Sequence, residues 1–326
     1  MGVDVSAMPR GMAPAAEPGD AAAEARPARQ RVSALGGSPT GVRVGFRVAE
    51  WVAPHVAAVA AQKVWFRVPP APSPQRRDRG VSPGEPIRVD IAGRSLNVLS
   101  WGSGPVVLLI HGWSGWWQQL SVYVEPLVAA GMRVVAWDAP SHGDSAPGRY
   151  GSHASSIADL VDGVRAVSAA VGEVYGVVAH SAGAMAACMG LIEGLSPERV
   201  VLISPSVSGG DQVDYLTERL GWGPRTVRLV QRFVRRRFGL DMEDYDVPQR
   251  LLESGIPLPD ALFVQDADDA QAPPDSASRL AAVWRGATTL TTRGLDHFRV
   301  LWAPDTIRQA VSFIASGHLA GEPAGS

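Results

Sequence analysis

The chain has 326 residues, a formal net charge of −2 and 46% hydrophobic residues, enough for one large α/β domain or two small domains. The near balance of 30 Lys and Arg against 32 Asp and Glu, without a long basic block, argues against nucleic acid as the main partner. Cys188 is the single cysteine, which excludes an intrachain disulfide.

The first 86 residues are predicted to precede the main domain. Residues 1–40 are rich in Ala, Pro, Gly and Arg and poor in large apolar side chains, which predicts a disordered tail. They lack the pattern of a secretory signal, so we expect a cytoplasmic protein. Within residues 41–86 we expect an amphipathic helix over 46–68, packed on the domain, and a Pro-rich linker. Charged residues and a proline argue against a membrane span over 46–68, and contact with a membrane surface or a second copy is the alternative.

Predicted strands alternate with predicted helices from residue 87 to residue 318, and a flexible tail is expected over 319–326. A hairpin is expected over 87–101, around Ala92-Gly93. The further predicted strands cover residues 106–110, 134–137, 174–179, 200–203, 261–264 and 288–292. The predicted helices cover residues 117–130, 156–171, 182–194, 275–284 and 305–315. This alternation indicates an α/β fold with a doubly wound, mostly parallel sheet.

Polar residues follow the ends of five predicted strands. They are His111-Gly112-Trp113, Asp138 to Ser145, Ser181, Gln265 to Pro273, and Gly294 to His297. Sites in such sheets form beyond the carboxyl ends of the strands, so we expect these residues to lie close together. A serine, an acid and a histidine occur in that order along the chain.

Ser181 lies between a β-rich run that begins at Val174 and an alanine-rich helical run. A sharp strand-to-helix turn would expose its hydroxyl, and such a turn needs small residues two positions before and after the serine. Those positions hold Ala179 and Gly183. The usual pattern has glycine at both, so Ala179 is a mild departure.

These motifs resemble the α/β-hydrolase superfamily over roughly residues 87–313. The His-Gly-Trp113 sequence resembles the family's oxyanion loop, the turn at Ser181 its nucleophile elbow, and the loop ending at His297 its histidine loop. The resemblance implies Ser181 as the nucleophile, His297 as the general base, and the backbone amides of Trp113 and Ala182 as the oxyanion hole. It implies no cofactor and no metal ion, and it does not specify a substrate.

Three aspartates in one loop compete for the position of the triad acid. Asp269 stands four residues before Pro273, which matches the family's Asp-x-x-x-Pro pattern, and we expect it to be the acid. Asp268 is the second candidate and Asp266 the third, and the two that are not the acid are expected to be loop caps or solvated carboxylates. Asp296 is expected to be structural, because adjacent loop side chains usually diverge.

Three other polar residues near these motifs are expected to be structural. His111 should hold the oxyanion loop in shape, His180 should support the serine turn, and Asp138 should tie down the turn that follows it. Trp113 is expected either to form an apolar wall for an acyl group or to pack on the sheet.

The long segment over residues 205–258 is expected to form a helical cap, because apolar residues recur in it at helical spacing. We therefore expect a serine hydrolase that cleaves a carboxylic ester or thioester of a small-molecule acyl substrate. One alternative is an acyltransferase or a cofactor-free perhydrolase that uses the same three residues. The other is a non-catalytic ligand-binding protein on the same scaffold.

Overall fold

The computed structural model describes residues 40–73, 77, 80–238 and 245–321. Residues 1–39 of the expected N-terminal tail and residues 322–326 of the expected C-terminal tail lie outside the described residues.

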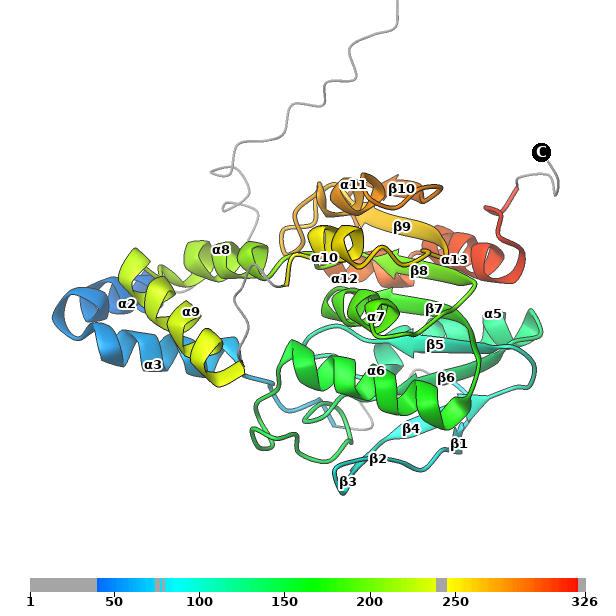
Figure 1. Cartoon of the computed structure of the whole chain (residues 1–326), viewed down its shortest axis with the longest axis horizontal. Coiled ribbons are helices and arrows are strands. Elements are labelled where there is room, and N and C mark those ends of the chain that lie inside the picture. Colours follow the sequence, from blue (N-terminus) through cyan, green and yellow to red (C-terminus); the bar gives the residue numbers. More distant parts are fainter. Residues whose placement is uncertain (1–39, 74–76, 78–79, 239–244, 322–326) are drawn as a thin grey trace, which may run out of the picture.

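An eight-stranded sheet forms the centre of the molecule, in the order β1-β4-β6-β5-β7-β8-β9-β10 (Figure 1). Its strands are β1 (Glu85–Pro86), β4 (Val98–Trp101), β5 (Val106–Ile110), β6 (Arg133–Trp137), β7 (Val174–His180), β8 (Arg199–Ile203), β9 (Asp260–Asp266) and β10 (Thr288–Thr292). Neighbouring strands are parallel from β6 to β10, whereas β4 runs antiparallel to both β1 and β6 at one edge. The expected α/β fold with a mostly parallel sheet is confirmed.

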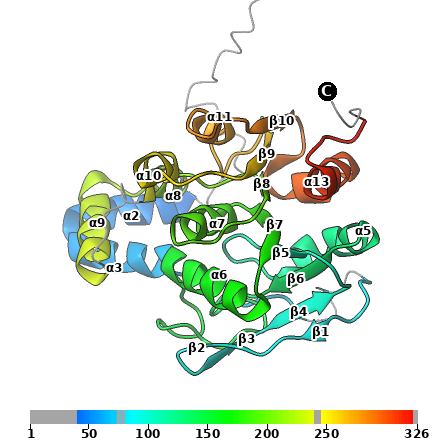
Figure 2. The same ribbon diagram turned by 45° about the vertical axis from the view of Figure 1, so that its right-hand side comes forward.

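Helices cover both faces of this sheet (Figure 2). One face carries η1 (Trp117–Tyr123), α5 (Val124–Ala129) and α13 (Pro304–Ser316). The other face carries α6 (Ile157–Val171), α7 (Ala182–Ile192), α10 (Val247–Ser254) and α11 (Ser276–Ala281). In β5, Leu108 and Ile110 belong to the core under α6 and α7, and Val107 and Leu109 belong to the core under α5 and α13. Both faces of the strand are buried, which is why its residues are all apolar.

Two segments differ in detail from the sequence-based expectation. β2 (Val89–Ile91) and β3 (Arg94–Leu96) form the expected hairpin as a separate two-stranded sheet, and the following β4 joins the main sheet. The predicted helix over 117–130 is instead a 3₁₀ helix, η1, followed by α5. Pro126 explains the break, because it lacks an N–H and its ring would clash with the preceding turn of a continuous α-helix.

Four helices form a cap to one side of the sheet. They are α2 (Thr40–Val52), α3 (Pro54–Trp65), α8 (Gly209–Leu220) and α9 (Pro224–Phe238) (Figure 1). The segment 205–258 supplies α8 and α9, but its third helix, α10, packs on α7. The N-terminal segment forms two helices rather than one, because Pro54 cannot continue α2 and instead begins α3. α3 packs on α9, so this segment extends the cap.

Candidate active site

Ser181 occupies a sharp turn between β7, near the middle of the sheet, and α7. Its backbone has φ 52° and ψ −121°, a conformation that costs energy for any residue with a side chain. The turn is held on both sides: the Ser181 N–H donates to the carbonyl of Ile203 at 3.0 Å, and its carbonyl accepts from the N–H of Ser206 at 3.2 Å. The neighbouring strand β8 thus keeps the strained serine in place.

Gly183 allows α7 to start directly behind the oxyanion loop. A Cβ atom at Gly183 would lie 2.4 Å from the carbonyl oxygen of His111 and 2.6 Å from that of Ile110. Both neighbours are backbone atoms at the end of β5, so they cannot move without shifting the loop. Only glycine fits at this position, as the sequence pattern around Ser181 predicts.

The Gly183→Ala variant is therefore expected to lose about 5 °C or more in melting temperature, because α7 must move away from β5. The matched control is Gly45→Ala in α2, where a Cβ atom meets nothing within 4 Å. This control should have an unchanged or slightly higher melting temperature, since alanine favours helix. Thermal unfolding of both variants checks the expectation, and equal melting temperatures would contradict it.

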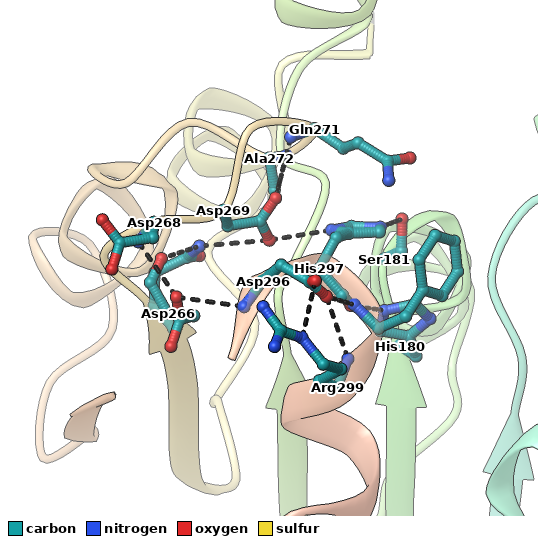
Figure 3. Close-up of polar contacts among 12 residues, drawn as sticks. His180, Ser181, Asp266, Asp268, Asp269, Gln271, Ala272, Asp296, His297 and Arg299 are labelled. Atoms are coloured by element: carbon teal, nitrogen blue, oxygen red, sulfur yellow. Dashed lines mark hydrogen bonds and ion pairs between the residues drawn. The ribbon is translucent and has the colours of Figure 1, made fainter. Parts of the chain in front are cut away.

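Ser181, His297 and Asp269 form one hydrogen-bonded chain (Figure 3). The Ser181 Oγ lies 2.9 Å from the Nε2 of His297, and the Nδ1 of His297 lies 2.8 Å from the Oδ2 of Asp269. A carboxylate only accepts, so Nδ1 carries the proton and Nε2 is left to accept from the serine hydroxyl. The side chain of Asp269 is fully buried and that of His297 is 6% exposed. The three residues come from the ends of β7 and β9 and from α12 (Asp296–Arg299), which follows β10.

The three aspartates of the β9 loop have different contacts. Asp269 is the one against His297, and its Oδ1 accepts from the N–H groups of Gln271 and Ala272 at 2.8 and 2.9 Å. Asp268 is exposed and accepts from the N–H of Gly294 at 2.9 Å. The structure therefore brings Asp269, rather than Asp268, to the histidine.

Asp266 holds the loop that precedes His297, which is the loop-capping role expected for an aspartate that is not the acid. It is buried, and its carboxylate accepts from the Thr292 hydroxyl at 2.7 Å and from the N–H groups of Leu295 and Asp296 at 3.1 and 3.2 Å. These contacts tie the loop before His297 to the end of β9. Its place as the last residue of a buried strand was the available signal, because a carboxylate there must find donors in neighbouring loops.

Asp296 is structural in its contacts, as expected. It has φ 58°, and its Oδ1 accepts from the N–H groups of Phe298 and Arg299 at 3.0 and 3.1 Å. Its Oδ2 pairs with the Arg299 guanidinium at 2.8 Å. The side chain thus caps the short helix that carries His297, and its carboxylate contacts Arg299 (Figure 3).

The backbone amides expected to hold an oxyanion belong to Trp113 and Ala182, and both residues line the cavity that contains Ser181. Ala182 begins α7, where the first N–H groups have no acceptor within the helix. Within the described part of the chain, neither N–H donates a hydrogen bond to a backbone or side-chain acceptor. Both groups are available to an anionic atom near Ser181.

Two buried histidines hold the loops around Ser181. His111 donates from Nδ1 to the Gly112 carbonyl at 2.7 Å and accepts at Nε2 from the Ala139 N–H at 3.0 Å. His180 donates from Nε2 to the carbonyl of His297 at 2.9 Å, and their rings lie 4.7 Å apart. Burial lowers the pKa of His111 and of His180 to about 3, so both stay neutral.

Asp138 ties down the turn after β6, as expected. Its carboxylate accepts from the side chain of Asn97 at 2.8 Å, from the N–H of Trp117 at 2.7 Å and from the N–H of Asp144 at 2.9 Å. Complete burial raises its pKa to about 6 in spite of these donors. It lies outside the Asp269–His297–Ser181 chain and fixes the start of η1.

The buried histidines are expected to make the fold sensitive to acid. Burial also lowers the pKa of His142, to about 4. In the unfolded chain these three groups titrate near 6.5, so their stability contribution is complete above that pH and is lost as the pH falls toward 3 to 4. At pH 5 the loss is about 2 kcal/mol for each histidine, and the raised pKa of Asp138 opposes it by only about 1 kcal/mol.

Thermal unfolding should therefore show a steep fall in stability between pH 6.5 and pH 4. The His142→Gln variant, first shown to be folded at pH 8, should lose about 2 kcal/mol less at pH 5 than the wild type. Parallel pH profiles for the two proteins would contradict this expectation.

A cavity of about 590 Å³ opens above Ser181, between the sheet and the cap. Trp113 and Met185 line it from the core, Tyr215 and Val234 from α8 and α9. The end of α3 and the residues after it, 64–67, form a further part of the wall. Sequence reasoning missed this N-terminal contribution, because helical periodicity shows that a helix is amphipathic without showing which element it covers. Trp113 lines the cavity and also packs against the core under α6 and α7, and its indole donates to the Arg67 carbonyl at 3.1 Å.

The described residues contain neither a metal-binding cluster nor a membrane-spanning helix. No group of three or more His, Cys, Asp and Glu side chains there is arranged to hold a metal ion. In the same residues, no helix combines the length and apolar character needed to cross a membrane.

Comparison with known proteins gives a family match and many structural neighbours. The model of the alpha/beta hydrolase family matches residues 107–323. No curated protein sequence matches the chain.

Among solved structures, the chain is similar to an esterase from Exiguobacterium antarcticum (15% identity, TM-score 0.54, 72% of this chain and 100% of the other covered). It is similar to a meta-cleavage product hydrolase from Pseudomonas fluorescens (18% identity, TM-score 0.54, 72% of this chain and 99% of the other covered). It is also similar to a monoacylglycerol lipase from Paleococcus ferrophilus (20% identity, TM-score 0.52, 68% of this chain and 99% of the other covered). At these identities the likeness shows a shared fold.

Proposed function

The chain belongs to the alpha/beta hydrolase family, and on that premise we propose that it is a serine hydrolase that cleaves carboxylic esters or thioesters. The observation that carries the proposal is the chain of hydrogen bonds from Asp269 through His297 to Ser181, at 2.8 and 2.9 Å, on the floor of a cavity. A serine hydroxyl becomes a nucleophile when a neighbouring base takes its proton, and this chain supplies that base.

The reaction begins when the Oγ of Ser181 attacks the substrate carbonyl carbon and its proton passes to the Nε2 of His297. Asp269 accepts the Nδ1 hydrogen bond, keeps the imidazole in the required tautomer and stabilises the imidazolium. The N–H groups of Trp113 and Ala182 stabilise the oxyanion. Collapse of the tetrahedral intermediate breaks the bond to the alcohol or thiol, which leaves with the proton from His297. Water then repeats the sequence on the acyl-enzyme and releases the acid.

The charged side chains on the cavity wall, apart from histidines, are Arg67 and Arg219. No aspartate or glutamate lines the described part of this cavity, and neither arginine forms an ion pair within the described residues. A guanidinium that faces a cavity without a carboxylate favours an anionic ligand group. We infer that the preferred acyl group carries a carboxylate or a phosphate remote from the scissile carbonyl.

Turnover of a p-nitrophenyl ester series tests the proposed reaction. The expected result is release of p-nitrophenol, with an initial burst that approaches one equivalent of enzyme for esters whose acyl-enzyme is hydrolysed more slowly than it forms. Added alcohol or thiol acceptors then separate a hydrolase from an acyltransferase, because a transferase yields the acylated acceptor in place of the free acid. Absence of turnover for every ester, with ligand binding retained, would overturn the proposal and favour a binding protein.

The charge preference is tested with pairs of p-nitrophenyl esters of equal length that end in a methyl or a carboxylate group. Arg219→Met should raise KM for the carboxylate-ended ester about tenfold and leave the methyl-ended ester within twofold. An equal change for both esters would show that Arg219 acts only through packing of α8.

A further inference from the structure

The cap exposes an apolar face that is unlike the rest of the described surface. Most of the exposed large hydrophobic side chains of the described residues lie on α2 and α3: Val42, Val44, Val48, Trp51, Val52, Val56, Val59 and Val64. Trp51 is 79% exposed and Val52 is 80% exposed. Within α2, Val44, Val48, Trp51 and Val52 follow helical spacing along one side, and Val56 and Val59 do the same in α3. We call these six residues the apolar face.

The opposite sides of the same helices are already used for packing. Phe46, Ala61 and Trp65 contact a cluster that includes Trp222 and Val230 of the cap. Each helix therefore has two apolar sides: one is buried in the cap, and the other is exposed to water. Scattered surface hydrophobics are ordinary, but a group of them on two helices that pack on each other indicates an interaction surface.

A row of arginines lies beside this face. Arg225, Arg228, Arg232 and Arg236 occur at helical spacing on the exposed side of α9, and we call them the basic stripe. In the described part of the chain, Arg228, Arg232 and Arg236 form no ion pair. The acidic residue on α2, α3 and the described part of α9 is Glu50, which is buried and accepts from the N–H of Arg225 at 2.6 Å.

The apolar face and the basic stripe contact each other at Trp51 and Arg225. The guanidinium of Arg225 lies over the ring of Trp51, 5.3 Å from its centroid. α3 and α9 lie side by side in both views (Figures 1 and 2) and pack against each other. The neighbouring cap helix α8, which also contacts α2, carries Asp211, Asp214 and Glu218, and Asp211 pairs with Arg279 of the core at 2.7 Å. The outer surface formed by α2, α3 and α9 thus combines apolar and cationic groups.

We propose that this surface docks on the face of a lipid bilayer that contains anionic headgroups. Valine and tryptophan side chains can enter the boundary between headgroups and acyl chains, while arginines beside them bind phosphate. The guanidinium geometry suits phosphate oxygens, and the amphipathic Trp51 suits the interface. The bilayer is the occupant that satisfies both kinds of group at once.

A second copy of the chain fits this surface less well. Two copies that met through the same face would bring their basic stripes together, and like charges at an interface oppose association. An anionic bilayer has no such conflict. The N-terminal residues 1–39 also match the surface poorly, because they contain few large apolar side chains and a balance of acids and arginines.

Docking in this orientation brings the bilayer next to the cavity wall. α3 carries Val56 and Val59 on the apolar face, and its last turn supplies Val64 and Trp65 to the cavity. A lipid-derived or membrane-dissolved acyl substrate would then enter beside the end of α3. The docking itself does not depend on the reaction, so it is measured separately from catalysis.

Cosedimentation of the full chain with vesicles tests the proposal. Vesicles of phosphatidylcholine alone are compared with vesicles that contain phosphatidylglycerol, at low and high salt. We expect the protein to pellet with the anionic vesicles, to pellet much less with the neutral ones, and to be released as salt rises. The Ser181→Ala protein should pellet like the wild type.

Two sets of substitutions separate the two parts of the surface. Arg228→Gln, Arg232→Gln and Arg236→Gln together should weaken partition into anionic vesicles roughly 100-fold. Trp51→Ser with Val48→Ser should weaken it at least tenfold at every salt concentration. Turnover of a water-soluble ester should stay within twofold of wild type in both sets, which shows that the cap is folded.

Arg88→Gln and Leu252→Ser are the matched controls, because both side chains are exposed on other parts of the molecule. They should pellet like wild type. The proposal is overturned if the protein ignores both kinds of vesicle, or if the substituted and control proteins pellet equally. A dimer in sedimentation velocity that Trp51→Ser dissolves, without vesicle binding, would assign the face to a second copy instead.

Discussion

Replacing Ser181 with alanine is expected to lower kcat for a p-nitrophenyl ester by about four to six orders of magnitude. The variant keeps the cavity, the oxyanion donors and His297, but it has no atom that can form the acyl-enzyme. KM should change little, because the methyl group of alanine occupies less space than the serine side chain. Steady-state kinetics of the purified variant check this expectation, and the burst of p-nitrophenol should disappear.

Ser206 provides the control for this substitution. It lines the same cavity, and its N–H donates to the carbonyl of Ser181, but its side chain is not part of the Asp269–His297–Ser181 chain. Ser206→Ala should keep kcat within about tenfold of wild type. A large loss in Ser206→Ala combined with an active Ser181→Ala would contradict the proposed role of Ser181.

Replacing Asp269 with asparagine is expected to lower kcat by about three to four orders of magnitude. The asparagine amide can donate a hydrogen bond to Nδ1 of His297, which favours the tautomer with its proton on Nε2. That tautomer cannot accept the proton of Ser181. Kinetics above pH 7, where the tautomer decides the rate, measure the loss. The change in volume is small, so the melting temperature should change far less than kcat.

Variants of the neighbouring aspartates, Asp268 and Asp266, test whether Asp269 alone acts as the triad acid. Asp268→Asn should keep kcat within about fivefold, because an amide oxygen can still accept from the N–H of Gly294. Asp266→Asn should lower the melting temperature. The Asp266 carboxylate accepts from four groups, and the NH₂ group of an asparagine would face some of these N–H and O–H donors without an acceptor. Equal losses of kcat in Asp268→Asn and Asp269→Asn would contradict the assignment of the acid.

The sheet and its polar edge could be predicted from sequence because buried parallel strands are apolar throughout. The continuous apolar run over β5 favours such a strand, and the structure shows its alternate residues in cores on opposite faces of the sheet. The small residues around Ser181 could be interpreted on steric grounds, because the backbone at the end of β5 occupies the space that a side chain at Gly183 would need. The family, the fold and the hydrolase class are confirmed by the comparisons and the sheet. The roles of Ser181, His297 and Asp269 stay predictions.

The cap could not be predicted from sequence to the same extent. The helical spacing in α2 and α3 shows an amphipathic segment, but these helices are apolar on two sides, so the pattern does not say which side packs. Their partner, α9, lies more than 150 residues later in the chain. Contacts between segments so far apart in the chain depend on the assembled sheet. The sheet places α9, which follows β8, on the same side of the molecule as α2 and α3, which precede β1.

The central claim, an activated serine at position 181, is tested most directly by labelling with a fluorophosphonate. Intact mass and peptide mapping are compared for the wild type, Ser181→Ala and His297→Ala. The account predicts one adduct per wild-type chain, on Ser181, and none on the folded variants. A folded wild-type protein that takes no label, or a label that maps to another residue and persists in Ser181→Ala, would contradict it.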